Sequence, residues 1–117
     1  MYKKNRLSLR EDFQKVYRFG KSTANQQFVV YQLLKPSQLD LRLGVSVSKK
    51  LGNAVVRNRL RRMMKEIVRL HLSELENKVD IIILARKPSS EMDYLAMEKS
   101  LLHVLKRSGL IKQVKKE

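Results

Sequence analysis

Four segments of the chain carry the apolar patterns of β-strands. Residues 27–34 (QFVVYQLL) are rich in the β-branched and aromatic residues that strands favour, and residues 22–25 predict a short strand before them. In residues 41–48 (LRLGVSVS), apolar positions alternate with small or polar ones, as in a strand with one buried face. Residues 79–85 (VDIIILA) are the most apolar stretch and indicate a central strand, with Asp80 expected to point outward.

The two-residue period also assigns side chains to the two faces of the predicted sheet. On the core face of residues 41–48 we expect Leu41, Leu43, Val45 and Val47, and on the other face Arg42, Gly44, Ser46 and Ser48. Phe28 and Tyr31 are an odd number of positions apart, so they should lie on opposite faces. Burial in the core is the default role of Phe28, whereas the hydroxyl of Tyr31 favours a position with one wet end.

Helices are predicted near both ends of the chain. Ser8 begins a motif with the spacing of a capping box, and the helix that follows it, residues 9–19, should end at Gly20. The last helix is predicted for residues 91–107, with Ser90 as its N-cap. The apolar side of this last helix is expected to consist of Met92, Leu95, Leu102, Val104 and Leu105.

The longest predicted helix follows Asn53, whose side chain can cap the free N–H groups of the first turn. Its apolar stripe repeats at helical spacing and consists of Val56, Leu60, Met63, Met64 and Ile67. Away from this stripe lie Arg57, Asn58, Arg61, Arg62, Lys65 and Arg69. Cations near a helix N-terminus oppose the helix dipole, at roughly 0.3–1 kcal/mol each when exposed. Because stability alone does not favour this arrangement, the basic side is expected to bind something negative.

The order of these elements is α-β-β-(β)-α-β-α, in which the bracket marks an additional short strand. This order predicts a two-layer α/β (α+β) sandwich, in which three helices pack on a single mixed sheet of about four strands. No internal repeat or linker divides the sequence, so residues 1–117 are expected to form one domain. The basic ends, about residues 1–6 and 110–117, are expected to be short and flexible.

The charge of the chain limits the kind of partner it can have. Its 117 residues include 26 Lys and Arg against 11 Asp and Glu, which gives a formal net charge of +15. The positively charged side chains repel one another in the folded state, and a polyanionic partner would relieve this repulsion. Residues 49–65 contain no acidic residue at all. The absence of acidic residues from this basic segment favours a nucleic-acid interface over an ordinary solvated basic face.

The sequence argues against a disulfide-bonded, membrane-spanning or secreted protein. The chain has no cysteine, which excludes disulfides and thiolate metal sites. No apolar run reaches the roughly 18–20 residues that span a bilayer. The N-terminus also lacks the apolar region of a signal peptide. We therefore expect a soluble, cytoplasmic protein with no membrane partner.

No group of residues has the spacing of a catalytic site. The serines lack a nearby acid–histidine pattern, and neither GxGxxG nor GxxxxGK[ST] occurs. His71 and His103 occur singly, and for His71 a partly buried, hydrogen-bonded role is favoured over metal binding. The sequence therefore predicts a binding protein rather than a self-sufficient catalyst, with no cofactor bound tightly by the protein.

One motif is specific enough to indicate a family. Arg57-Asn58-Arg59 lies inside SVSKKLGNAVVRNRLRR, after the segments DFQKVYRFG and QFVVY and before IIILARKP. In this order the segments resemble the protein subunit of bacterial ribonuclease P over about residues 6–105. The resemblance implies a ribonucleoprotein endonuclease that removes the 5′ leader of precursor tRNA, with catalysis by the RNA subunit and its bound Mg²⁺. It also implies a left-handed β-α-β crossover, an exception to the usual hand.

The same resemblance implies two binding surfaces and two partners. The surface for the catalytic RNA comprises Lys49, Lys50, Asn53, Arg57, Asn58, Arg59, Arg61, Arg62, Lys65 and Arg69. A cleft between the first helix and the sheet would hold the single-stranded leader and comprises Phe13, Tyr17, Tyr31, Ser46 and Ser48. Arginine binds phosphate oxygens in pairs, and aromatic rings stack on unpaired bases. The implied partners are ribonuclease P RNA, with one protein per RNA, and precursor tRNA.

Alternative interpretations of the same residues stay open. A ribosomal or general RNA-binding protein would carry a similar charge, and the RNA that it captures would distinguish it. A stand-alone nuclease would cleave precursor tRNA without an RNA subunit, but the sequence has no clustered set of carboxylates for such a reaction. Core packing is the alternative role for Phe13.

Overall fold

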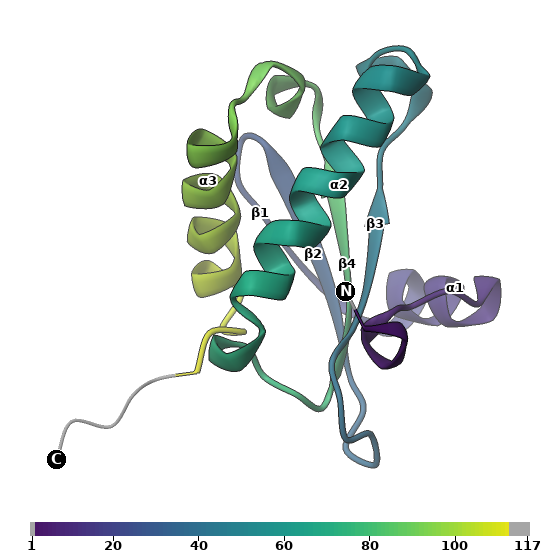
Figure 1. Ribbon diagram of the computed structural model, residues 1–117. Helices are drawn as coiled ribbons and strands as arrows, with labels where there is room; N and C mark the ends of the chain where they lie inside the picture. Colours follow the sequence, from purple (N-terminus) through teal and green to yellow (C-terminus); the bar gives the residue numbers. More distant parts are fainter. Residues whose placement is uncertain (1, 113–117) are drawn as a thin grey trace, which may run out of the picture.

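A four-stranded mixed sheet runs through the middle of the molecule (Figure 1). In this computed structural model, which describes residues 2–112, the strands are β1 (Lys21–Ala24), β2 (Phe28–Leu34), β3 (Arg42–Ser46) and β4 (Val79–Ala85). Their order across the sheet is β1-β2-β4-β3; β3 is parallel to β4, and the other neighbouring pairs are antiparallel. The predicted strand 79–85 is confirmed, and so is its central place in the sheet.

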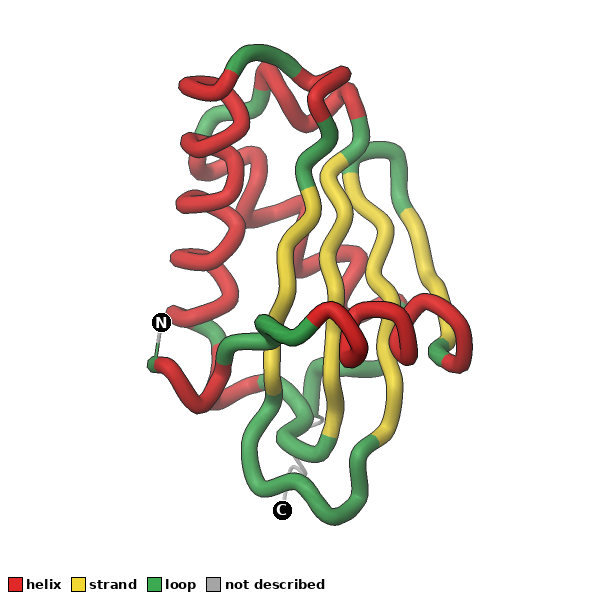
Figure 2. Tube along the Cα trace, turned by 90° about the vertical axis from the view of Figure 1, so that its right-hand side faces the viewer, coloured by secondary structure: helices red, strands yellow, loops and turns green. Residues whose placement is uncertain are grey.

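Three helices cover the sheet from both sides. They are α1 (Arg10–Phe19), α2 (Ala54–Leu70) and α3 (Tyr94–Arg107), with short 3-10 turns in the connections. α2 and α3 pack on one face, whereas α1 crosses the other face and leaves part of it uncovered (Figure 2). The predicted α+β fold, with three helices and one mixed sheet of four strands, is confirmed. Within the described part of the chain, no helix has the length and apolar character needed to cross a membrane.

The connection from β3 to β4 is left-handed. The two strands are parallel neighbours, and α2 lies between them in the chain. In Figure 1 the chain rises along β3, descends through α2 in front of the sheet, and rises again along β4, to the left of β3. This is the hand implied by the family resemblance, and it is opposite to that of nearly all β-α-β units.

Two hydrophobic clusters lie on opposite faces of the sheet. The larger fills the space between the sheet and helices α2 and α3, and Phe28 and Leu60 are among its fully buried members. The smaller lies under α1 and consists of Leu7, Val16 and Ile82, with a few partly buried neighbours. Because hydrophobic stabilisation scales with the apolar area removed from water, α1 is held by far less of it than the other two helices.

The predicted alternation in residues 41–48 is confirmed, although β3 itself is shorter. Leu41, Leu43, Val45 and Val47 all belong to the larger cluster or pack against it. Gly20 follows α1 as its C-cap, also as predicted, but its φ of −81° is not left-handed. Glycine is required here for another reason, because a Cβ on Gly20 would lie 2.5 Å from the carbonyl oxygen of Gln32 in β2.

The caps predicted for the first and last helices were wrong. The N-cap of α1 is Leu9 instead of Ser8, and no side chain caps this helix. The N-cap of α3 is Asp93 instead of Ser90, and its Oδ1 accepts a hydrogen bond from the Ala96 N–H at 2.8 Å. α3 starts later than predicted because the chain before it forms a 3-10 turn, Lys87–Glu91.

The buried side of α3 also differs from the predicted one. Leu95 is 73% exposed, and Leu102 is only half-buried. The buried residues of the helix are Met97, Ser100, Leu101, Val104 and Leu105. The prediction counted leucines and missed Met97, from which the true apolar side repeats at i+4, i+7 and i+8.

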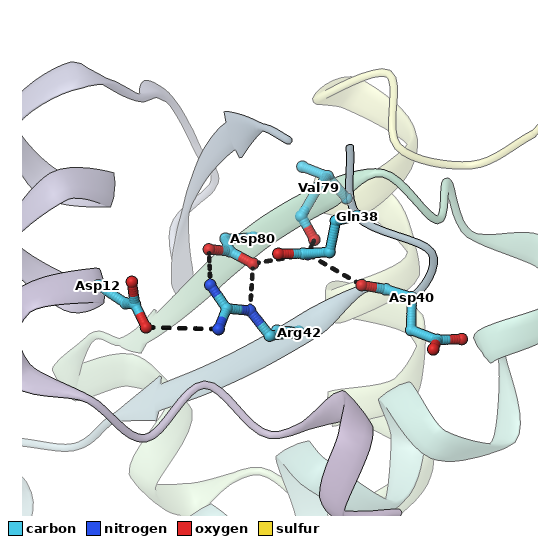
Figure 3. A network of polar contacts seen from close by, with 6 residues as sticks. All are labelled: Asp12, Gln38, Asp40, Arg42, Val79 and Asp80. Carbon is cyan, nitrogen blue, oxygen red and sulfur yellow. Dashed lines mark hydrogen bonds and ion pairs between the residues drawn. The ribbon is translucent and has the colours of Figure 1, made fainter. Parts of the chain in front are cut away.

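Asp80 is buried, so the outward position predicted for it from the alternation of β4 is wrong. Its side chain is fully buried and pairs with Arg42 of β3 (Figure 3). A carboxylate in an apolar strand is stable only when its charge is compensated, and no local pattern in the sequence marks Arg42 as the partner.

Packing extends into both of the predicted flexible ends. Asn5 is buried, and its Nδ2 donates to the carbonyl oxygen of Leu41 at 2.8 Å. Leu110 is buried in the larger cluster, and Ile111 forms a β-bridge with Leu75. These residues therefore pack against the rest of the domain, whereas residues 1 and 113–117 lie outside the described part of the chain.

Candidate nucleic-acid interface

α2 separates an apolar side from a basic side, as predicted. Its N-terminus is capped by Asn53, whose Oδ1 accepts a hydrogen bond from the Val56 N–H at 3.0 Å. Leu60, Met64 and Ile67 are fully buried, and Val56 and Met63 pack against the same cluster. The buried stripe also includes Val68, which the sequence analysis missed. With this side facing the sheet, the basic side of the helix is turned toward solvent.

The solvent side of α2 forms a shallow hollow of about 510 Å³, which we call the basic hollow. It is lined by Val55, Asn58, Arg61, Arg62 and Lys65. Among residues 2–112, neither Arg62 nor Lys65 lies within 4.0 Å of a carboxylate, and both are exposed. The hollow therefore presents positive charge that the described residues leave uncompensated.

Arg61 is held in place at the edge of the basic hollow. Its Nη1 donates to Asn58 Oδ1 at 3.0 Å, and its Nη2 donates to the carbonyl oxygen of Val47 at 3.4 Å. Both partners are neutral, so the guanidinium keeps its full charge. Because the Arg61 guanidinium is already held in one orientation, its side chain loses less entropy when it binds a phosphate.

Arg59 points away from the basic hollow, which the sequence did not indicate. Its Nη2 donates to the carbonyl oxygen of Ser90 at 3.0 Å, and its Nη1 contacts Met63 Sδ at 3.6 Å. It lines a separate, smaller hollow of about 270 Å³ beside Glu66 and Tyr94. Arg59 thus joins α2 to the turn before α3.

The remaining predicted RNA-binding cations differ in their surroundings. Arg69 is paired with Glu66, at 2.5 Å between Nη2 and Oε1, so the two charges offset each other. Their hydrogen bond lowers the pKa of Glu66 and raises that of Arg69. Arg57 is half-buried, and its Nε has no hydrogen-bond partner in the described structure. Lys49 and Lys50 are exposed in a 3-10 turn that precedes α2.

The second candidate surface is the predicted cleft between α1 and the sheet. The Phe13 ring lies directly on β3, so closely that a Cβ on Gly44 would overlap the ring. Tyr17 of α1 and Tyr31 of β2 are in edge-to-face contact, with ring centroids 4.8 Å apart and planes at 76°. Burial raises the pKa of the Tyr17 phenol, and its hydrogen bond with Ser46 opposes this shift. Four of the five predicted cleft residues are therefore neighbours.

The aromatic residues considered for core packing or cleft lining differ in burial. Phe13 is half-buried and packs against the smaller cluster, whereas Tyr17 is 41% exposed. Phe28 is fully buried on the opposite face, as its spacing from Tyr31 predicted. Ser48 is exposed beyond the end of β3, at the start of the 3-10 turn.

The structure adds two residues to the cleft that the sequence analysis missed. Val29 of β2 pairs with Leu84 of β4, which in turn pairs with Ser46 of β3. Val29 and Leu84 are partly exposed, and by the alternation of their strands they lie on the same face of the sheet as Tyr31 and Ile82. That Val29, Leu84 and Ser46 are neighbours follows from the register of the strands, which is known only once the fold is known.

The two surfaces meet at the end of β3. Ser46 belongs to the cleft, whereas the carbonyl oxygen of the next residue, Val47, accepts a hydrogen bond from Arg61 of the basic hollow. The end of β3 therefore links the two candidate surfaces, with Ser46 on the face of the sheet under α1 and Val47 on the face under α2.

His71 has the hydrogen-bonded role that the sequence favoured. Its Nδ1 is hydrogen bonded to Glu74, and its Nε2 lies 3.2 Å from Glu98 Oε2. Burial lowers the pKa of His71, but the two carboxylates outweigh this effect and hold the pKa above its ordinary value. Across residues 2–112, no group of three His, Cys, Asp or Glu side chains could hold a metal ion.

Fold and surfaces together define an α+β protein with an exposed basic helix next to an aromatic cleft, a combination suited to RNA. The family model described as Ribonuclease P matches residues 1–109. The ribonuclease P protein component of Bacillus cereus strain AH187 is 53% identical over 116 residues, which cover 99% of this chain and 100% of the relative. The chain belongs to the bacterial ribonuclease P protein family, the protein subunit of an enzyme of tRNA processing, and this membership implies ribonuclease P RNA as a partner.

Solved structures agree with this assignment. The RNase P protein of Staphylococcus aureus superposes with a TM-score of 0.87 at 44% identity, covering 92% of this chain and 98% of the other. The RNase P protein of Thermotoga maritima gives a TM-score of 0.79 at 36% identity, covering 87% and 96%. The fold is therefore shared along nearly the whole length of these proteins.

Proposed function

We propose that this protein binds ribonuclease P RNA through the basic side of α2 and the 5′ leader of precursor tRNA through the cleft under α1. Cleavage itself is assigned to the RNA subunit and its Mg²⁺, so that the protein alone is inactive. One protein acts per RNA, in the cytoplasm. The single observation that carries the proposal is that Arg61 of the basic hollow is hydrogen bonded to Val47, the residue that follows Ser46 at the end of β3.

The basic hollow supports the RNA-binding half of the proposal. Arg61, Arg62 and Lys65 present three cations on one side of a rigid helix. Arginine binds two phosphate oxygens at once, and lysine adds a point charge. Such contacts fix the orientation of a protein on a folded RNA without reading its sequence. Residues Lys49, Lys50, Asn53, Arg57 and Asn58 are assigned to the same surface.

The cleft supports the leader-binding half of the proposal. Tyr17 and Tyr31 form an aromatic pair with one exposed member, and Ser46 adds a hydroxyl beside them. Unpaired bases stack on such rings whatever their identity, since every base has an aromatic face. A leader of variable sequence is the kind of strand that this surface would accept.

The assignment of cleavage to the RNA is what membership of the ribonuclease P family implies, and the chemistry of the side chains supports it. Among residues 2–112, the acidic and histidine side chains do not gather in a group that could hold Mg²⁺. No step of the proposal depends on a Mg²⁺ ion held by the protein alone. His71, the half-buried histidine, is engaged by two carboxylates on the side of the molecule formed by α2 and α3.

Replacing Tyr31 with leucine is expected to lower the affinity for precursor tRNA about five- to hundredfold in the reconstituted complex. This is the loss of about 1–3 kcal/mol of base stacking. Leucine keeps apolar bulk beside Ile82 while removing the ring. The measurement is the dissociation constant of the complex for precursor and mature tRNA, with Tyr2→Leu as the control at an exposed tyrosine outside the cleft. Equal losses for precursor and mature tRNA would show that the cleft does not bind the leader.

A further inference from the structure

The shape of the cleft depends on where α1 lies, and α1 has few contacts to hold it there. Val16 is its one buried residue, and the cluster beneath it has only Leu7, Val16 and Ile82 as buried members. An isolated helix of this length is marginal in water, so α1 needs the sheet both to form and to stay in place. Apolar packing has no preferred direction, so it leaves sliding and tilting of the helix weakly restrained.

A directional contact is present at Asp12, in the first turn of α1 (Figure 3). Arg42 of β3 makes a two-point ion pair with Asp80 of β4, with Nε–Oδ1 at 2.8 Å and Nη2–Oδ2 at 2.6 Å. The remaining terminal nitrogen, Nη1, donates to Asp12 Oδ2 at 3.3 Å. The Asp12 side chain is only 14% exposed and that of Asp80 is fully buried, so solvent screens this network weakly.

The guanidinium that holds Asp12 is itself held in a fixed orientation. A two-point pair between arginine and a carboxylate fixes the plane of the guanidinium as well as its position. Gln38 restrains the same carboxylate, because its Nε2 donates to Asp80 Oδ1 at 2.9 Å and to the Asp40 carbonyl oxygen at 2.9 Å. Through Arg42, the position of the central strand β4 therefore determines where Asp12 lies.

This network lies beside the cleft. Asp12 precedes Phe13 in α1, and Arg42 lies two residues before Gly44 on the same face of β3. The Phe13 ring lies on Gly44, so the ion pair and the ring contact are neighbours along the same two elements. A shift of Asp12 would therefore move Phe13, and with it the rest of α1 that carries Tyr17, relative to the sheet.

We propose that the Asp12–Arg42–Asp80 network positions α1 and thereby sets the width of the cleft for a single-stranded leader. This inference rests on the proposed function of the cleft. Stability is a weaker explanation, since burying charges costs desolvation and well-packed apolar residues often stabilise as much or more. Unlike apolar packing, an ion pair restrains the position and orientation of α1 relative to the sheet. Asp12 and Arg42 are positioning residues in this account, because they act through α1 and contact no RNA.

The test compares Asp12→Ala with Glu11→Ala. Both variants remove one negative charge from the first turn of α1, but Glu11 is exposed and has no ion pair in the described structure. Asp12→Ala leaves the Arg42–Asp80 pair intact, so no buried charge is left without a partner. Asp12→Asn is included because an amide oxygen still accepts the hydrogen bond from Arg42 without the charge.

Two measurements are made on each variant, assembled with a bacterial ribonuclease P RNA. The first is the ratio of the dissociation constants for mature and precursor tRNA, which reports leader binding. Asp12→Ala is expected to lower this ratio about three- to tenfold, Asp12→Asn less, and Glu11→Ala not at all. The second is amide hydrogen exchange of the free protein, where Asp12→Ala should speed exchange in α1 and leave α2 and α3 unchanged.

The possible outcomes distinguish the positioning role of Asp12 from leader binding in the cleft. A wild-type ratio in Asp12→Ala would overturn the positioning role while leaving leader binding in the cleft intact. Equal weakening for both tRNAs and for the ribonuclease P RNA would show a merely structural role and also overturn it. If the wild-type complex does not distinguish precursor from mature tRNA, the proposed function of the cleft itself is wrong.

Discussion

Replacing Arg62 and Lys65 together with alanine is expected to weaken binding to ribonuclease P RNA by about 10- to 100-fold. Both side chains line the basic hollow, and neither has an ion-pair partner among the described residues. Their removal therefore costs the folded protein little. Each phosphate that the variant no longer binds removes an exposed hydrogen bond, which contributes about 0.5–1.5 kcal/mol net.

The salt dependence of binding shows whether phosphate binding is what the variant lacks. Each phosphate contact contributes about 0.7–0.9 to the slope of log affinity against log salt concentration, so the double variant should lower that slope by about 1.4–1.8. The matched control is Lys99→Ala with Lys106→Ala, which removes the same charge from exposed positions on α3. Equal changes of slope in the two double variants would mean that net charge, and not the basic side of α2, determines binding.

Replacing Arg42 with methionine is expected to lower the free energy of unfolding by about 3–5 kcal/mol. The change leaves the fully buried carboxylate of Asp80 without its cation, and an unpaired buried charge is among the costliest defects in a protein core. For a domain of this size such a loss is a large part of the total stability.

Urea denaturation of the variants measures this effect. Arg42→Met combined with Asp80→Leu should recover much of the loss, because the buried charge is then removed with its partner. Arg69→Met is the control at an exposed ion pair, where the denaturation midpoint should change little. If Arg42→Met were as stable as the Arg69→Met control, the buried pair would have no structural importance.

Local patterns in the sequence were enough to predict most of the elements. The apolar run that forms β4 and the two-sided pattern of α2 both reflect burial on a regular period, which a sequence displays directly. The cap at Asn53 was also predicted correctly, because its side chain bonds a backbone group only three residues away. The crossover between β3 and β4 followed from the resemblance to a family and from no physical pattern.

Features that depend on distant parts of the chain could not be predicted. The role of Asp80 depends on Arg42, 38 residues away. The different roles of Arg59 and Arg61 arise because Ser90 and Val47, on separate segments, accept their hydrogen bonds. The capping motifs failed at α1, which no side chain caps, and at α3, where a 3-10 turn occupies the residues before the helix. Which strand residues are neighbours depends on sheet register.

Reconstitution with a bacterial ribonuclease P RNA at low Mg²⁺ concentration tests the central claim most directly. The claim is that the polypeptide holds RNA while its RNA partner breaks the bond. We predict that precursor tRNA is cut at the end of its 5′ leader when both components are present, much more slowly by the RNA alone, and not by the protein alone. Cleavage of precursor tRNA by the purified, RNA-free protein would contradict this account.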